Sequence, residues 1–276
     1  MAEVFKRSRV VPAWLAASRH LANRPDQEDR NVILEIASPQ EITAEDYRVI
    51  AAVNQALQQV RADRTVMTAA GTIFPQRIYQ YYGRPQWYEK YEEIIAHGKA
   101  KNTWGTYAHR MISRSAPDGT TFNPLEKIIE KLASRKDPAQ TQFKAAYELS
   151  TTDIGADLFD AGFELPTYDP AIDRASYMGS PCLSHLTFKM IGDKIDLTAI
   201  YRSHYYAERA LGNLIGLAQL QGYVAKEAGF ETGVLTCVST HAKLDKGLGG
   251  IVSARRLLAS SPEDIDVRAA APAQPA

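Results

Sequence analysis

The chain has little cysteine, with only Cys182 and Cys237 among its 276 residues. The two stand far apart, and neither lies in a Cys-x-x-Cys pair or beside a His-x-x-x-His pair. A reducing cytosol disfavours disulfides, and zinc sites normally draw on such paired ligands. The sequence therefore predicts neither a disulfide nor a metal site. It leaves Cys182 as either a buried apolar residue or a nucleophile.

Net charge and long apolar runs are also missing. Lys plus Arg and Asp plus Glu both number 32, so the sequence offers no general attraction to nucleic acid or to an acidic membrane surface. No apolar run is long enough to cross a bilayer, and residues 1–18 lack the uninterrupted apolar core of a signal peptide. We expect a cytoplasmic protein with no nucleic-acid or membrane partner.

What the chain does have is apolar residues, at 45% of the total, which suffice for a sizeable core. We predict a single α+β domain over residues 1–261 and a disordered tail over 262–276, which is rich in alanine and proline. Near the start we expect a buried strand closed by Pro39. An amphipathic helix over 42–60, with Thr43 as its N-cap, should follow.

Residues 72–95 are rich in aromatic side chains interleaved with basic ones. This composition is typical of surfaces that stack nucleic-acid bases, and also of rings that pack in a core or at a subunit interface. We favour the second interpretation and expect a loop-rich subdomain. A helix over 123–134, with Pro124 at its start, is predicted next.

The most informative region begins at Cys182, which follows a proline at the start of a β-rich segment. The segments 186–191 and 194–203 are joined by Gly192-Asp193, a pair that favours a tight hairpin. The second segment alternates strictly. One face carries Ile195, Leu197, Ala199 and Tyr201, and the other carries Thr198, Ile200 and Arg202.

A helix predicted over 205–229 is apolar nearly all round, which indicates a central, buried helix. Asn213 lies within it, and a buried amide needs hydrogen-bond partners. Another buried strand, 231–245, leads out to His241. We expect the hairpin and this strand to form a mixed β-sheet packed on the buried helix.

Four features of this region follow one another along the chain in a distinctive order and spacing. A Pro-Cys opens a strand, a strand ending in Arg-Ser follows, a buried helix carries an Asn, and a last strand ends in a His. In this chain they are Pro181-Cys182, Arg202-Ser203, Asn213 and His241. The arrangement resembles the thymidylate synthase superfamily, which includes pyrimidine-nucleotide hydroxymethylases, over about residues 178–245.

The resemblance implies a role for each of these residues. Cys182 would add to C6 of the pyrimidine and make C5 enolate-like. Arg202 would lower the pKa of the thiol and contact the nucleotide phosphate, with Ser203 adding a hydrogen bond. Asn213 would read a uracil ring through one donor and one acceptor, whereas family members acting on cytosine tend to carry Asp there. His241 would bond the sugar hydroxyl.

The resemblance also implies a homodimer and 5,10-methylenetetrahydrofolate as the one-carbon donor. The family's pterin-binding aspartate falls on Tyr205, a possible folate-side residue. Its second sugar-binding tyrosine falls on Lys243, which we assign to the substrate. The family's Tyr-x-Pro-His-Pro segment is absent. Lys144, Arg135 and Arg174 are the alternatives for the phosphate-binding arginines that one subunit donates to the other.

Three functions stay open. The first is a methyl- or hydroxymethyltransferase acting at C5 of a uridine or deoxyuridine monophosphate. The second is an enzyme that keeps the cysteine addition but performs other C5 chemistry without folate. The third is a catalytically inactive protein that binds nucleotides or acts in assembly.

Overall fold

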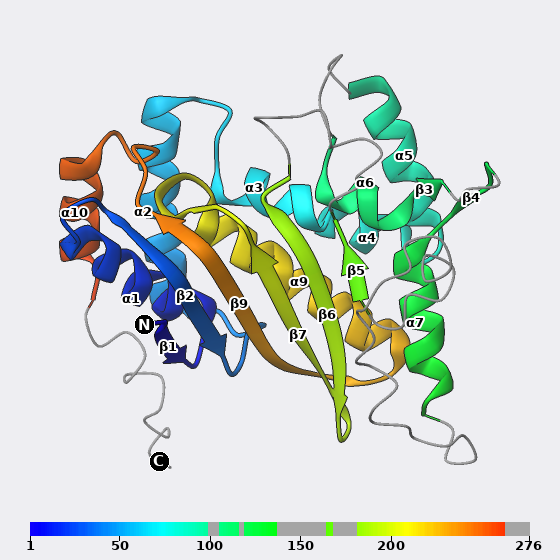
Figure 1. The fold of residues 1–276 in the computed structure, drawn as a ribbon. Coiled ribbons are helices and arrows are strands. Elements are labelled where there is room, and N and C mark those ends of the chain that lie inside the picture. The colour runs from blue at the N-terminus through cyan, green and yellow to red at the C-terminus, as the bar shows by residue number, and fades with distance from the viewer. Residues whose placement is uncertain (99–104, 116–118, 137–163, 168–180, 263–276) are drawn as a thin grey trace, which may run out of the picture.

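The computed structural model describes residues 1–98, 105–115, 119–136, 164–167 and 181–262 (Figure 1). Its strands are β1 (Glu3–Arg7), β2 (Glu28–Ile36), β3 (Arg114–Ser115), β4 (Thr121–Phe122), β5 (Glu164–Pro166), β6 (Leu183–Ile191), β7 (Lys194–Tyr201), β8 (His204–Tyr205) and β9 (Glu231–Lys243). Its helices are α1 (Val10–Asn23), α2 (Ala44–Val60), α3 (Val66–Ile73), α4 (Gln76–Tyr82), α5 (Gln86–Gly98), α6 (Tyr107–Ile112), α7 (Pro124–Ser134), the π-helical turn η1 (Tyr206–Ala210), α9 (Leu211–Ala228) and α10 (Ile251–Ser260). The predicted tail lies outside the described residues apart from its first residue.

The main sheet is mixed and runs in the order β1-β2-β9-β7-β6-β5, with β8 paired to β9. Strands β6 and β7 form the predicted antiparallel hairpin, and Gly192 takes a positive φ of 63° at its turn. Strand β9 runs parallel to β7 and antiparallel to β2. The predicted α+β class and mixed sheet are therefore confirmed.

The helices cover one face of this sheet, as Figure 1 shows for α1, α2, α3 and α9 behind β2, β9 and β7. The alternation along β7 explains why. Ile195, Leu197, Ala199 and Tyr201 are fully buried beneath the helices. Thr198 and Ile200, on the opposite face, are only half-buried.

Helix α9 lies at the centre of the molecule and is buried on most of its surface, as its nearly uniform apolar sequence predicts. It contacts β7 and β9 on one side and α1, α3 and α7 on the others. Gly229, in the left-handed conformation at φ 79°, ends the helix.

The closest approach in the core is between α9 and α3. A Cβ atom on Gly212 would lie 2.4 Å from the carbonyl oxygen of Val66 and 2.6 Å from the Cβ of Ala69. A Cβ on Gly216 would lie 2.7 Å from the carbonyl oxygen of Ala70. Because the atoms in the way belong mostly to backbone, only glycine permits this helix spacing.

The predicted helix starts are confirmed. Thr43 and Asp46 form a reciprocal capping box on α2. The Asp46 carboxylate also accepts a hydrogen bond from the Arg9 guanidinium at 2.8 Å, and both side chains are 1% exposed. Asn123 caps α7, with Pro124 in its first turn.

The prediction of a loop-rich subdomain over residues 72–95 is wrong, because this segment forms α4 and α5. Aromatic residues have modest intrinsic helix propensity, but tertiary burial of their rings stabilises both helices. Trp87 is 0% exposed and packs edge-on against Phe74 and Tyr223. The interpretation that these rings pack in a core is confirmed for Trp87 and Tyr91.

We expect Gly212→Ala to lower the free energy of unfolding by about 1–3 kcal/mol, the usual cost of overpacking a filled core. Gly71→Ala on α3 is the matched control, because a Cβ there meets nothing within 4 Å. It should be neutral, or stabilising by up to about 1 kcal/mol through helix propensity. Urea unfolding followed by circular dichroism measures both, and equal effects would contradict the close-packing argument.

Candidate active site around Cys182

Cys182 stands just before β6, and its backbone is held on both sides. Its N–H and that of Leu183 donate to the phenolic oxygen of Tyr107 on α6, at 3.0 and 3.2 Å. Its carbonyl accepts from the N–H of Arg202 at 2.9 Å. The half-buried thiol is thereby fixed at the open end of the β6–β7 hairpin.

Two opposing effects act on the Cys182 thiol. Burial raises its pKa above the ordinary value, and the positive charges of Arg202 and Arg209 partly offset this increase. The Arg202 guanidinium is anchored by a hydrogen bond from Nε to the carbonyl of Pro181 at 2.9 Å. Buried Cys237 has no comparable cation, and its pKa rises to about 12. Cys182 is therefore the more reactive thiol of the two.

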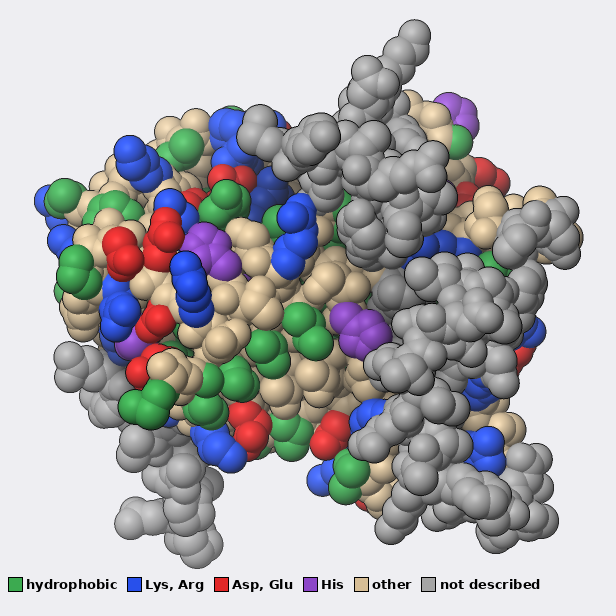
Figure 2. Space-filling model, viewed as in Figure 1, with side chains coloured by type: hydrophobic (Ala, Val, Ile, Leu, Met, Phe, Trp, Pro, Cys, Tyr) green, Lys and Arg blue, Asp and Glu red, His purple; other side chains and the backbone are tan. Residues whose placement is uncertain are grey.

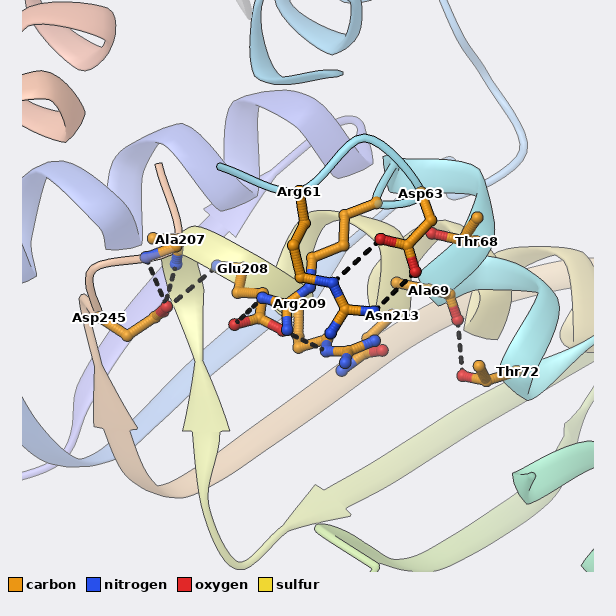
Figure 3. A network of polar contacts seen from close by, with 12 residues as sticks. Arg61, Asp63, Thr68, Ala69, Thr72, Ala207, Glu208, Arg209, Asn213 and Asp245 are labelled. Atoms are coloured by element: carbon orange, nitrogen blue, oxygen red, sulfur yellow. Dashed lines mark hydrogen bonds and ion pairs between the residues drawn. The ribbon is translucent and has the colours of Figure 1, made fainter. Parts of the chain in front are cut away.

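Arg209 was not among the residues predicted from the sequence. It lies on η1, and its Nε is 3.1 Å from a carboxylate oxygen of Glu208. The other oxygen of Glu208 accepts from Arg64 at 2.8 Å. Figure 3 shows this group, with Arg61 and Asn213, where η1 leads into α9. The sequence signal was a pair of charges, Glu208 and Arg209, at the start of an otherwise apolar helix.

Asn213 belongs to a buried chain of polar side chains. Its Nδ2 lies 3.2 Å from Nε2 of His204. Nδ1 of His204 lies 3.0 Å from Oγ of Ser239, which lies 3.2 Å from the Tyr206 hydroxyl. The His204 ring stacks on Tyr201 at 3.9 Å between ring centroids. Burial lowers the pKa of His204 to about 3, so the imidazole is neutral at physiological pH.

His204 was also missed by sequence reasoning, which assigned only its neighbours Ser203 and Tyr205. Its side chain cannot be linked to Asn213 without knowing that β8 packs against η1, the turn that leads into α9. Ser203, which lies between Arg202 and His204 in the sequence, is half-buried. Tyr205 is 44% exposed.

His241 and Lys243 share a partner that the sequence did not identify. Nε2 of His241 lies 3.0 Å from one carboxylate oxygen of Glu28 on β2, and Lys243 donates to the other. These bonds lower the pKa of Glu28. Lys243 also stands opposite Tyr205 where β8 pairs with β9. The two contacts with Glu28 therefore tie β2 to the end of β9.

The predicted residues thus fall into three neighbouring groups. Cys182 is joined to Arg202, Asn213 to His204, and His241 to Lys243 through Glu28. Lys144 and Arg174 lie outside the described residues, and Arg135 is the C-cap of α7.

The described ranges contain neither a metal-binding cluster nor a membrane-spanning helix. In that part of the chain, no group of three His, Cys, Asp or Glu side chains is arranged to hold a metal ion. None of its helices is long and apolar enough to span a bilayer.

Comparison with known proteins gives several archaeal relatives, each named "Putative thymidylate synthase". The chain is 35% identical over 153 residues to the protein from Methanococcoides burtonii, covering 55% of this chain and 58% of the relative. It is 42% identical over 62 residues to that from Methanosarcina mazei, covering 22% and 29%. It is 26% identical over 164 residues to that from Methanothermobacter marburgensis, covering 59% and 61%.

The chain therefore spans less than two thirds of the length of each of these relatives. No protein-family model matches it.

We expect Arg209→Gln to slow alkylation of Cys182 by iodoacetamide at fixed pH. Losing the positive charge raises the pKa of the thiol further, so the rate–pH profile moves to higher pH. Arg255→Gln is the control, because Arg255 binds the carbonyl of Ala22 instead. Peptide mass spectrometry separates Cys182 from Cys237. An unshifted profile in Arg209→Gln would show that this arginine does not act on the thiol.

Proposed function

Because the chain is a divergent, thymidylate-synthase-like protein, we propose that it transfers a one-carbon unit to C5 of a uracil nucleotide, with Cys182 as nucleophile. The relatives' names support one-carbon transfer to a pyrimidine at the family level. The observation that carries the proposal is the half-buried Cys182 thiol held beside Arg202 and Arg209. We further propose that residues 1–261 form one catalytic domain with a thymidylate-synthase-like sheet.

The proposed chemistry begins with addition of the Cys182 thiolate to C6. A sulfur–carbon bond forms, and the electrons of the C5–C6 double bond move toward O4. C5 then has enolate character and can attack an electrophilic carbon. Loss of the C5 proton and expulsion of the thiolate from C6 restore the double bond and free Cys182. The residue is thus regenerated in each cycle.

The surrounding residues supply binding groups for a nucleotide monophosphate. Arg202, Arg209 and the Ser203 hydroxyl offer charge-assisted and neutral donors for a phosphate. Oδ1 of Asn213 can accept from uracil N3–H, while the second hydrogen of Nδ2 can donate to O4. His241 and Lys243 are assigned to the sugar hydroxyls, with Glu28 fixing their positions.

The relatives' names support a folate cofactor at the family level, but the described residues do not fit one. A pterin presents adjacent N–H donors that a carboxylate accepts, and Tyr205 offers a half-exposed phenol instead. The nearby carboxylates of Glu28 and Glu208 are already paired with cations. No step above is therefore assigned to 5,10-methylenetetrahydrofolate. This mismatch is the observation that supports a second candidate function, cysteine-driven C5 chemistry without folate.

We also propose that the protein is a homodimer that pairs through the open face of its sheet. Among the described residues, Figure 1 shows no helix in front of β2, β9 and β7, and Figure 2 shows hydrophobic side chains on that face. The half-buried side chains there include Ile33, Ile200 and Val238. A wide sheet face with β-branched apolar residues is the kind of surface that a second sheet covers.

Substitution of the nucleophile tests the chemistry without any one-carbon donor. The wild-type protein should release bromide from 5-bromo-dUMP with an added thiol as reductant, and should form a covalent adduct with 5-fluoro-dUMP. Cys182→Ser should lose both activities while still binding nucleotide, because serine is a far weaker nucleophile. Cys237→Ser should keep both, at some cost in stability. A wild-type protein that binds dUMP but does neither would be the inactive binding protein.

Size-exclusion chromatography with light scattering tests the dimer at micromolar concentration. The wild-type protein should run at twice its 30.6 kDa mass. Val238→Glu places a charge in the proposed interface and should give a folded monomer. Val252→Glu on α10 is the control, because that side chain is 73% exposed on another surface. A monomeric wild type would contradict the proposal.

A further inference from the structure

The buried chain from Asn213 to Tyr206 couples the orientation of the Asn213 amide to the tautomer of His204. Nδ2 of Asn213 can only donate, so Nε2 of His204 must be the nitrogen without a hydrogen. Nδ1 of His204 then carries the hydrogen and donates it to Oγ of Ser239. A hydroxyl can accept this bond and still donate onward to Tyr206. Every bond in the chain is therefore consistent with one imidazole tautomer.

The same side chains permit one other consistent arrangement. If Ser239 donated to Nδ1, then Nε2 would carry the hydrogen and Asn213 would have to turn its oxygen toward the ring. The amide and the tautomer therefore change together. The ring itself cannot turn freely, because it stacks on Tyr201 with an interplanar angle of 3° and is 1% exposed.

The two arrangements present opposite groups to a pyrimidine. With Nδ2 on His204, Oδ1 has no partner within the described residues and can accept from uracil N3–H. With the amide turned, the NH2 group would face the ring edge and match N3 of cytosine, which only accepts. Protonation does not intervene, because burial keeps the imidazole neutral far below physiological pH.

We propose that His204, held in its Nδ1–H tautomer by Ser239, is a positioning residue that orients the Asn213 amide and thereby sets the preference for uracil over cytosine. The base preference in this inference rests on the proposed function. The tautomer of His204 does not, because it is argued from contacts within the protein. No contact of His204 with substrate is required, since it acts through Asn213.

The tautomer can be measured without any nucleotide. In protein labelled with 15N-histidine, Nε2 of His204 should show the shift of an unprotonated ring nitrogen and Nδ1 that of an N–H, unchanged between pH 5 and 8. The signals are assigned by their loss in His204→Phe, which keeps a ring against Tyr201. A protonated Nε2 would overturn the proposal.

The base preference is measured by calorimetric titration of dUMP and dCMP. Ser239→Ala and His204→Phe should each reduce the uracil-to-cytosine affinity ratio by about tenfold to a hundredfold, the worth of a two-bond base contact. Ser184→Ala is the matched control, because its hydroxyl bonds the Ile200 carbonyl on the same sheet. Asn213→Asp should favour cytosine, since a carboxylate only accepts.

Retention of the wild-type ratio in folded Ser239→Ala and His204→Phe would overturn the positioning role. A wild-type protein that binds neither nucleotide would overturn the base preference together with the proposed function. In that case the nitrogen spectrum still decides whether His204 holds the Asn213 amide as stated.

Discussion

The contact of α9 with α3 through bare glycine backbone is the constraint on which the rest of the structure depends. At Gly212 an added methyl group would meet a carbonyl oxygen at 2.4 Å, and at Gly216 another at 2.7 Å, so the observed helix spacing requires glycine at both positions. Asn213 follows directly, and its amide is buried against His204 of β8 rather than exposed to solvent. The helix spacing that fills the core is thus also what buries the polar group of the site.

Burial of that polar group is tolerated in part because His204 pairs with the nitrogen of the Asn213 amide. An unpartnered buried amide or imidazole costs about 1–3 kcal/mol. A sequence that left either group without any hydrogen-bond partner would therefore lower the free energy of unfolding. Here Asn213, His204, Ser239 and Tyr206 pair in sequence. Such a network loses more than one bond when one member is removed. Stability and the proposed ligand recognition therefore place the same demand on these residues.

Sequence patterns predicted the elements whose burial follows from a local pattern of apolar residues. The alternation in β7 and the uniformly apolar α9 fixed their burial, and Gly192 marked the hairpin turn. The order of the strands in the sheet, the helices α4 and α5, and the links from Asn213 to His204 depend on contacts between distant segments. No local pattern encodes such contacts. The site residues carried by motifs were named from the sequence, whereas Arg209 and His204 needed the fold.

The environment of Cys182 reflects a balance between reactivity and protection. Burial raises the pKa of the thiol, which lowers the fraction of thiolate at neutral pH, while Arg202 and Arg209 restore part of that fraction. A thiolate of higher pKa is intrinsically the stronger nucleophile, so the loss in population is partly recovered in the rate of addition. A thiol that stays mostly protonated is also less readily oxidised. Under the proposed function, the two arginines would matter most when a bound ring excludes water, because a lower local dielectric strengthens their attraction for the thiolate.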